Sequence, residues 1–340
     1  MAVDLVRPST TTGARARIWP TSWPWQAQIL LLGAIWGGSF PFIKVADRSF
    51  APFDIAGGRV ALAAVTVTLV LAATGGHLPR GRTRWAHLAV AGLFMNVLPF
   101  TVIAWAELRI SAIAAGILNA TTPLFTLPFA FLLVPSERMT KSRIVGLIIG
   151  FLGVIVVLGA WHGLPNGQIL GYLASLAGAL SYGIGLPYTR RFVTTDNESV
   201  TSLAAGQLIC ATVEMAVISP AFLRVPLQVS GESLASLIAL GVLCTGIAYM
   251  LSYSIVGVAG ATSTSLVTFL IPIFATIFGA ALLSERLSWY EPAGAVVVLA
   301  GVALVQGMRI RPRRASRALW EATRRHAVPA RPICEETPGG

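Results

Sequence analysis

Charged residues are scarce in this chain. Asp, Glu, Lys and Arg together account for only 11% of the 340 residues, whereas a soluble domain uses about 25% of such residues to cover its surface. Hydrophobic residues account for 55%, and the mean hydropathy is +0.74. This composition excludes an ordinary soluble domain and indicates an integral membrane protein.

Cysteine and histidine are rare as well, with three and four residues. Cys210 and Cys244 lie in apolar runs and Cys334 lies near the C-terminus, so no paired spacing indicates disulfides or zinc. The sequence also contains no GxxxxGK[ST] loop for ATP and no HExxH motif. We therefore expect no cofactor, no metal and no catalytic residues, which argues against an ATP-driven pump and against an intramembrane enzyme.

Acidic residues are few beside basic ones, and the net charge is +11. A basic balance can indicate a nucleic-acid partner, but here the Lys and Arg residues gather in short connections and in the C-terminal tail. That distribution is typical of membrane topology. We expect membrane lipid as a partner and no nucleic acid.

Apolar runs of about 20 residues recur along the whole chain, and each is long enough to cross a hydrocarbon core of roughly 30 Å as a helix. A helix also satisfies its own backbone hydrogen bonds in lipid. The first run lacks a cleavage site and is predicted to remain as a span. The sequence therefore predicts an all-α integral membrane protein with ten transmembrane helices, at residues 25–45, 52–74, 85–106, 112–134, 143–160, 168–189, 199–221, 232–256, 259–283 and 290–308.

The positions of Lys and Arg predict the orientation. If the N-terminal tail at 1–24 is cytoplasmic, the inner segments hold nineteen of these residues and the outer segments hold five. Positive residues favour the cytoplasmic side, so we expect a multi-pass protein of the cell membrane with both termini in the cytoplasm. The basic tail at 309–340 is predicted to be disordered along the anionic inner leaflet.

An internal repeat is the most informative feature of the sequence. Shifting the chain on itself by 146–149 residues aligns one span after another, with these matches: Gly37 with Gly183, Pro41 with Pro187, Gly92 with Gly241, Pro123 with Pro272, Gly146 with Gly294, Gly153 with Gly301, and Ser136-Glu137-Arg138 with Ser284-Glu285-Arg286. The repeat predicts two five-helix halves, at 25–161 and 168–308. Because five is odd, the second half must enter the membrane from the opposite side, as in the inverted repeats of many secondary transporters.

At these residues the chain resembles the EamA-type members of the drug/metabolite transporter (DMT) superfamily. The resemblance rests on the Trp36-Gly37-Gly38-Ser39-Phe40 segment, on Arg59, on the proline spans followed by Ser-Glu-Arg, and on the glycine-rich fifth and tenth spans. It implies ten helices in two EamA-like repeats and a small-molecule solute as partner. The implied function is efflux or exchange of a small metabolite, amino acid or drug-like compound by alternating access. A channel or a structural membrane protein remains the alternative.

Polar and aromatic side chains inside spans are the candidates for solute binding, because a polar group facing lipid is costly. The same side chains could instead join helices to one another. The candidates are Trp36, Ser39, Phe40, Asn96, Trp105, Asn119, Thr122, Tyr182, Tyr249 and Thr268.

Proline and glycine inside spans predict where helices bend and where they pack closely. Pro123, Pro187 and Pro272 are predicted helix breaks, since proline frees a backbone carbonyl. Glycine stripes in the fifth and tenth spans favour close helix packing. The sequence leaves open whether these two helices meet each other or meet a second copy in a homodimer.

Two intramembrane charges, Arg59 and Glu214, lie at similar depths in the second and seventh spans. They could form an ion pair, which would offset the cost of removing both charges from water. Alternatively, Glu214 could carry a proton, as intramembrane carboxylates often do, or its side chain could reach the membrane surface. We expect the ion pair.

Overall fold

The structure is a computed structural model that describes residues 23–134, 139–159, 161, 166–194, 198–222 and 228–307. Within these ranges all regular structure is helical and no strand is present, so the predicted all-α fold is confirmed. Almost all of the predicted N-terminal tail, the whole tail at 309–340, the loop at 162–165 and the Ser136-Glu137-Arg138 segment lie outside the described residues.

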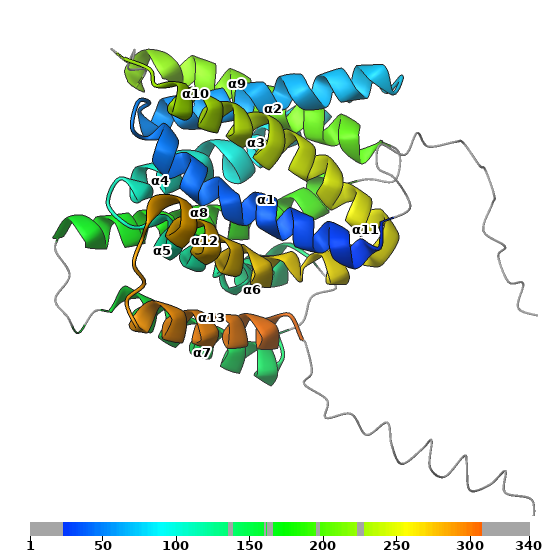
Figure 1. Cartoon of the computed structure of the whole chain (residues 1–340). Coiled ribbons are helices and arrows are strands. Elements are labelled where there is room, and N and C mark those ends of the chain that lie inside the picture. The colour runs from blue at the N-terminus through cyan, green and yellow to red at the C-terminus, as the bar shows by residue number, and fades with distance from the viewer. Residues whose placement is uncertain are drawn as a thin grey trace, which may run out of the picture.

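The first half crosses the bundle five times (Figure 1), and its third and fourth crossings are each built from more than one helical piece. Its elements are α1 (Trp25–Ala46), α2 (Pro52–Ala73), then α3 (Arg82–Gly92), the π-helix η1 (Leu93–Val97) and α4 (Leu98–Glu107), then α5 (Ala112–Asn119) and α6 (Thr122–Leu133), and α7 (Lys141–Leu158).

The second half repeats this order of elements. Eight of the ten crossings are at least 18 residues long and apolar enough to span a membrane, and α12 and α13 are shorter apolar helices. Because each half makes five crossings, the second half is inverted relative to the first. Its elements are α8 (Asn166–Tyr188) with the π-helix η3 (Thr189–Val193), α9 (Val200–Phe222), α10 (Gly231–Ile238) with the π-helix η4 (Ala239–Ile247) and α11 (Ala248–Thr264), α12 (Val267–Leu283), and α13 (Tyr290–Val305).

The boundary between the eighth and ninth crossings differs from the predicted one at residues 257–258. The helix passes Gly260, which has φ 80° and ψ 164°, and α12 begins only at Val267. These angles lie in a region that essentially only glycine adopts. The expected boundary fell at 257–258, just before this glycine.

The helices of the two halves pack against each other rather than forming separate bodies. In Figure 1, α7 and α13 lie together along one side of the bundle, and α2, α9 and α10 lie on the opposite side. Between them, α1 packs on α12, and α8 packs on α4 and α6.

Glycine determines the closest of these contacts. A Cβ atom on Gly301 of α13 would lie 2.4 Å from the backbone nitrogen of Gly150 in α7, and one on Gly153 would lie 2.5 Å from the nitrogen of Val298. The glycine stripes of the fifth and tenth crossings therefore meet each other within one chain, which answers the question that the sequence left open.

The repeat also holds in three dimensions. A Cβ atom on Gly37 of α1 would lie 2.6 Å from the Cβ of Phe274 in α12, and one on Gly183 of α8 would lie 2.6 Å from the Cβ of Phe125 in α6. Gly37 and Gly183 are repeat partners at an offset of 146, and Phe125 and Phe274 are partners at an offset of 149. The two halves thus use equivalent residues for equivalent helix contacts.

Candidate functional site

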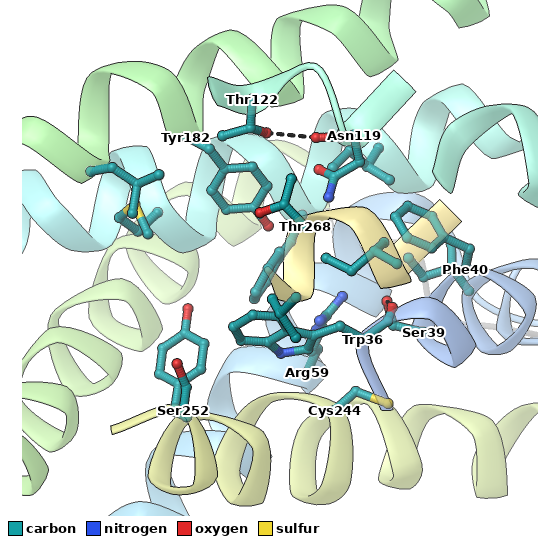
Figure 2. Close-up of a pocket in the computed structure, with 18 of the residues that line it drawn as sticks. Trp36, Ser39, Phe40, Arg59, Asn119, Thr122, Tyr182, Cys244, Ser252 and Thr268 are labelled. Atoms are coloured by element: carbon teal, nitrogen blue, oxygen red, sulfur yellow. Dashed lines mark hydrogen bonds between the residues drawn. The ribbon is translucent and has the colours of Figure 1, made fainter. Parts of the chain in front are cut away.

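A cavity of about 330 Å³ lies where the two halves meet. Its walls come from α1, α2, η1 and α4, the α5–α6 break, α8 and η3, α9, η4, α11 and α12. In Figure 2, Trp36 and Arg59 face it from one side, and Tyr182, Asn119 and Thr122 face it from the other. The volume suits a small organic molecule, since ligand pockets start at about 300 Å³.

The lining of the cavity follows the internal repeat. Most lining residues occur in pairs that are separated by the repeat offset of 146–149 residues. The pairs are Trp36/Tyr182, Phe40/Leu186, Ile43/Thr189, Arg59/Gln207, Met95/Cys244, Phe100/Tyr249, Ile103/Ser252, Asn119/Thr268 and Thr122/Ile271. The cavity therefore lies on the approximate symmetry axis that relates the two halves.

Arg59 is the only charged residue among the described residues that line the cavity. Its side chain is 7% exposed, its Nε donates to Thr245 Oγ1 at 2.8 Å, and its guanidinium carbon lies 3.9 Å from the centre of the Phe100 ring. Its terminal nitrogens make no hydrogen bond to any described residue.

Gln207, the repeat partner of Arg59, makes the equivalent contact in the other half. Its Nε2 donates to Asn96 Oδ1 at 2.8 Å, and Asn96 Nδ2 donates to the Tyr249 hydroxyl at 3.0 Å. Asn96 is the repeat partner of Thr245. Each half therefore extends one polar side chain, from α2 or α9, to a partner in the other half.

The structure brings eight of the ten predicted solute-binding residues together in the cavity wall: Trp36, Ser39, Phe40, Asn119, Thr122, Tyr182, Tyr249 and Thr268. The other two lie elsewhere. Asn96 is fully buried behind Tyr249. Trp105 packs its ring 3.6 Å from the guanidinium carbon of Arg109 and does not line the cavity.

The three predicted helix breaks behave differently. Pro123 occupies the first turn of α6, immediately after the interruption at 120–121 that separates α5 from α6. Pro187 lies within α8 and is followed by the π-helix η3. Pro272 lies inside the continuous helix α12, and the interruption before that helix falls at 265–266. Only Pro123 therefore lies directly at a break.

The predicted ion pair between Arg59 and Glu214 is not formed. Within the described part of the chain, the ion pairs are Arg48–Glu232 and Arg84–Glu198. Glu214 does not line the cavity, and its Oε2 atom is buried without a hydrogen-bond partner among the described residues. The expectation rested on depth along each helix, and depth does not predict the face from which a side chain projects.

Several lining residues were not among the predicted candidates. Gln207, Cys244 and Ser252 are repeat partners of Arg59, Met95 and Ile103. Applying the offset to every polar or charged residue inside a span would have found Gln207 directly.

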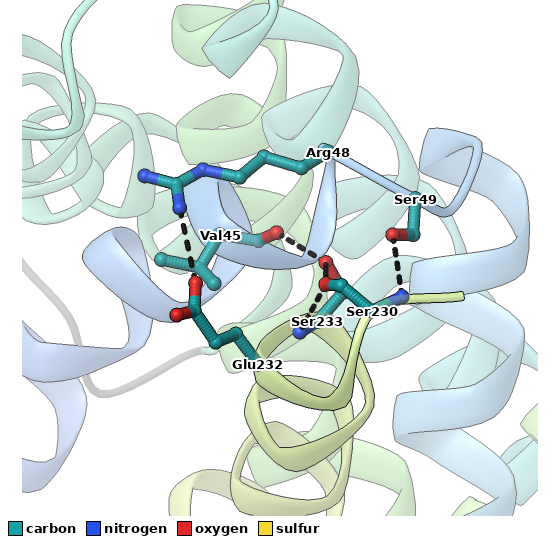
Figure 3. A network of polar contacts seen from close by, with 6 residues as sticks. All are labelled: Val45, Arg48, Ser49, Ser230, Glu232 and Ser233. Atoms are coloured by element: carbon teal, nitrogen blue, oxygen red, sulfur yellow. Dashed lines mark hydrogen bonds and ion pairs between the residues drawn. The ribbon is translucent and has the colours of Figure 1, made fainter. Parts of the chain in front are cut away.

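Contacts between the halves lie at both ends of the bundle. At the end that holds the α1–α2 connection, Ser233 Oγ donates to Val45 O at 2.9 Å, Ser230 N donates to Ser49 Oγ at 3.2 Å, and Arg48 pairs with Glu232 at 3.3 Å (Figure 3). We call this set the α10 clamp.

An equivalent set lies at the opposite end. Arg84 Nη1 donates to Val193 O at 2.9 Å, and Arg84 Nε lies 3.7 Å from Glu198 Oε1. We call this set the α3 clamp. Arg84 and Ser233 are related by an offset of 149, and Val45 and Val193 by an offset of 148. The two clamps are therefore repeat-related contacts at opposite ends.

Two unpartnered carboxylates lie near the α10 clamp. The side chain of Glu107 is fully buried, and neither its carboxylate oxygens nor those of Asp47 have a hydrogen-bond partner among the described residues. Burial raises the pKa of Asp47 to about 7, and the nearby ammonium group of Lys44 acts in the opposite direction. Lys44 itself donates to the carbonyl oxygens of Glu107 and Ile110.

A third carboxylate at this end does have partners, and they belong to the other half. Glu285, which follows α12, accepts hydrogen bonds from the backbone nitrogens of Ala112 at 2.9 Å and Ile113 at 3.1 Å. These are the first amides of α5, which no intrahelical carbonyl can satisfy. A second-half acid thus caps a first-half helix. No group of three His, Cys, Asp or Glu side chains in the described ranges is placed to hold a metal ion.

Comparisons with known proteins agree with this architecture. An uncharacterized transporter of Archaeoglobus fulgidus is 27% identical over 277 residues, which cover 79% of this chain and 93% of that protein. The uncharacterized inner membrane transporter YedA of Escherichia coli K12 is 29% identical over 292 residues, which cover 82% of this chain and 89% of YedA. One crystal structure matches with a TM-score of 0.60 over 84% of this chain and 97% of its own, and at 20% identity this likeness concerns the fold alone.

The family comparison gives two separate matches. The model of the EamA-like transporter family matches residues 23–159 and again residues 169–306, one match for each half. Together the matches cover most of the chain, as the resemblance in the sequence implied. This multi-pass membrane protein belongs to the EamA-like transporter family.

Proposed function

We propose that this transporter is a secondary carrier, which moves a small organic solute by alternating access between its two inverted halves. The observation that carries the proposal is the paired lining of the cavity, in which nine residues of one half have their repeat partners across the site. Inverted halves around a shared central site can exchange conformations, so that one site serves both faces of the membrane.

The two clamps are the contacts that would open in turn. Each clamp donates from the first turns of α3 or α10 to a backbone carbonyl in the other half, at N–O or O–O distances of 2.9 Å. Opening the α10 clamp while the α3 clamp stays closed would expose the cavity at one face, and the reverse would expose it at the other.

The proposal includes the cell membrane as location, both termini in the cytoplasm, and efflux or exchange as the direction of use. The distribution of Lys and Arg supports the orientation. The relative YedA is described as an inner membrane transporter. The α7–α13 contact forms within one chain, so the mechanism does not require a second copy.

A carrier and a channel differ in one measurable property. Proteoliposomes containing the full chain would be loaded with a mixture of cell metabolites, and mass spectrometry would follow which compounds leave. A carrier predicts that release of its solute is faster when the same mixture is present outside. Release at the same rate with or without the outside mixture would overturn alternating access in favour of a channel.

The matched control locks one end of the bundle. Ser49→Cys and Ser230→Cys, combined in one chain, put one thiol on each of the two residues that Ser230 N and Ser49 Oγ now join at 3.2 Å. Oxidation should stop the exchange and a reductant should restore it, whereas each single variant should be unaffected. Exchange that continues in the oxidised double variant would contradict the assigned role of the α10 clamp.

A further inference from the structure

We propose that the cavity binds an organic monocarboxylate with an apolar body, and that Arg59 holds the carboxylate. The inference rests on the proposed function only in taking the bound molecule to be the transported solute. Arg59 brings a full positive charge to the cavity wall, and no acidic side chain among the described lining residues offsets it.

The guanidinium group has unused donors. Among the described residues, only its Nε has a hydrogen-bond partner, Thr245 Oγ1 at 2.8 Å, and one face of the group is covered by Phe100. The residue is 7% exposed and forms part of the cavity wall. Glu107 lies within electrostatic range of Arg59 but forms no ion pair with it and does not line the cavity. A bound anion would accept from the terminal nitrogens in the fork geometry that guanidinium presents.

The repeat argues that the charge serves a ligand rather than the fold. Gln207 occupies the equivalent position in α9, lines the same cavity and makes the equivalent hydrogen bond, to Asn96 at 2.8 Å. An uncharged amide therefore suffices to join α9 to its partner across the bundle. The charge that Arg59 adds on the α2 side exceeds what this contact requires, and burying it costs free energy.

The rest of the lining indicates the chemistry of the ligand. A carboxylate carries one negative charge and neutralises Arg59, whereas a phosphate carries close to two at neutral pH and leaves a buried excess. The remaining walls are mainly aromatic and aliphatic. Their uncharged polar groups are the side chains of Ser39, Asn119, Thr122, Tyr182, Thr189, Gln207, Tyr249, Ser252, Tyr253 and Thr268. The cavity thus fits a small carboxylate whose body is apolar or aromatic.

The test uses four probes that share one aromatic body. Phenylacetate, phenylacetamide, phenethylamine and benzylphosphonate differ only in the charge and shape of the head group. Binding to the purified full chain would be measured by calorimetry near pH 7. Hydrogen bonds to a charged group predict that phenylacetate binds about 10-fold to 100-fold more tightly than its amide. Equal or tighter binding of the amide, the amine or the phosphonate would overturn the proposal, and so would no binding of phenylacetate.

The variant Arg59→Gln gives α2 the same side chain that α9 carries at the equivalent position, Gln207. It should retain the contact with Thr245 and lose the preference for phenylacetate over phenylacetamide. The preference is the ratio of the dissociation constants of two probes on the same protein, so partial loss of folded material does not affect it. An unchanged ratio would overturn the role of Arg59.

The double variant Arg59→Gln/Gln207→Arg moves the charge across the symmetry axis. If the cavity is symmetric in shape, this variant should recover a preference for phenylacetate, at least in part, and Thr245→Val should leave the preference in place. Failure of the proposed transport function can be told apart from failure of the proposed carboxylate site. Arg59-dependent binding of phenylacetate without exchange in proteoliposomes would support the carboxylate site and reject the carrier.

Discussion

Arg59 in α2 and Gln207 in α9 occupy equivalent positions in the two halves, and each donates to a partner in the opposite half, at 2.8 Å in both cases. One of the two side chains is charged and the other is neutral. A contrast in polarity also extends along the cavity wall, here in the opposite direction, since Met95, Phe100 and Ile103 of the first half have the more polar repeat partners Cys244, Tyr249 and Ser252.

Shape and chemistry therefore follow different rules in this protein. The positions of the lining residues repeat, as the proposed alternating access requires, because both halves would have to pack equally well in either arrangement. The residue types do not repeat, as the proposed carboxylate site requires, because such a solute is not symmetric and would need its charged end held on one side. Variants at repeat-related positions can separate these two requirements.

The largest effect is expected at the repeated glycines. Gly37→Leu and Gly183→Leu should each abolish or strongly reduce the folded protein, because a Cβ would lie 2.6 Å from a phenylalanine Cβ and within 3 Å of backbone atoms of the facing helix. Overpacking of this kind costs about 3 kcal/mol or more. Size-exclusion profiles and thermal melts of the purified variants would measure it. Gly257→Ala is the matched control, since a Cβ there meets nothing within 4 Å. A large loss in one glycine variant alone would contradict the structural equivalence of the halves.

A pH-dependent effect should distinguish the two ends of the bundle. Asp47, near the α10 clamp, has a pKa of about 7 in the folded protein against an ordinary 3.8. The folded chain therefore keeps a proton that the unfolded chain loses, so the free energy of unfolding falls as the pH rises from about 4 to 7. Asp47→Asn should remove this dependence and be more stable than the parent at pH 8, by about 4 kcal/mol at most.

Thermal melts of the parent and of Asp47→Asn at a series of pH values would measure this difference. Arg84→Gln, at the other end, is the matched comparison and should leave the slope between pH 4 and 7 in place. Parallel curves for the parent and Asp47→Asn would contradict the assignment.

Glu285 should have a smaller effect. Its carboxylate accepts from two otherwise unsatisfied amides of α5, at 2.9 and 3.1 Å. Glu285→Ala should lower the free energy of unfolding by about 2 kcal/mol, as expected for the loss of a helix cap with charge-assisted bonds. Denaturant melts would measure the change. Glu232→Ala is the control for loss of a carboxylate at the same end, and a loss in it as large as in Glu285→Ala would remove the special role of the cap.

The smallest effect is expected at the surface of the α10 clamp. The side chains of Arg48 and Glu232 are 57% and 77% exposed, whereas those of Arg84 and Glu198 in the α3 clamp are 19% and 21% exposed. Arg48→Ala should change the stability by less than about 0.5 kcal/mol. Arg84→Ala should cost more, since it also removes the bond to Val193 O. A reversed order in melts of the two variants would contradict the contacts assigned to the clamps.

Much of the architecture could be predicted from the sequence, because lipid restricts the backbone to helices and the repeat offset relates one half to the other. The eight predicted residues in the cavity wall followed from the rule that polar side chains avoid lipid. The glycine spacing in α7 and α13 predicted close packing but not the partner, since small residues permit approach by any helix.

What could not be predicted depends on rotation about helix axes and on local backbone bends. By residue count, Arg59 and Glu214 lie at similar depths in their predicted spans, but depth does not fix which neighbour a side chain faces. Trp105 was assigned to the site for its aromatic ring, yet Arg109, four residues later, covers that ring. The bend at Gly260 depends on the positive φ of one glycine, and hydropathy does not report backbone angles.

Alternating access is tested most directly by measuring access to the cavity from each face of the membrane. Ser252 lines the cavity on α11, so Ser252→Cys, in a chain whose Cys210, Cys244 and Cys334 are replaced by Ser, reports on that site alone. A membrane-impermeant maleimide would be added to either face of oriented vesicles. Alternating access predicts labelling from both faces of the membrane. Once Ser49→Cys/Ser230→Cys has been oxidised in the same chain, it predicts labelling from a single face. Labelling from both faces in the locked protein, or from a single face whether locked or not, would contradict alternating access around this cavity.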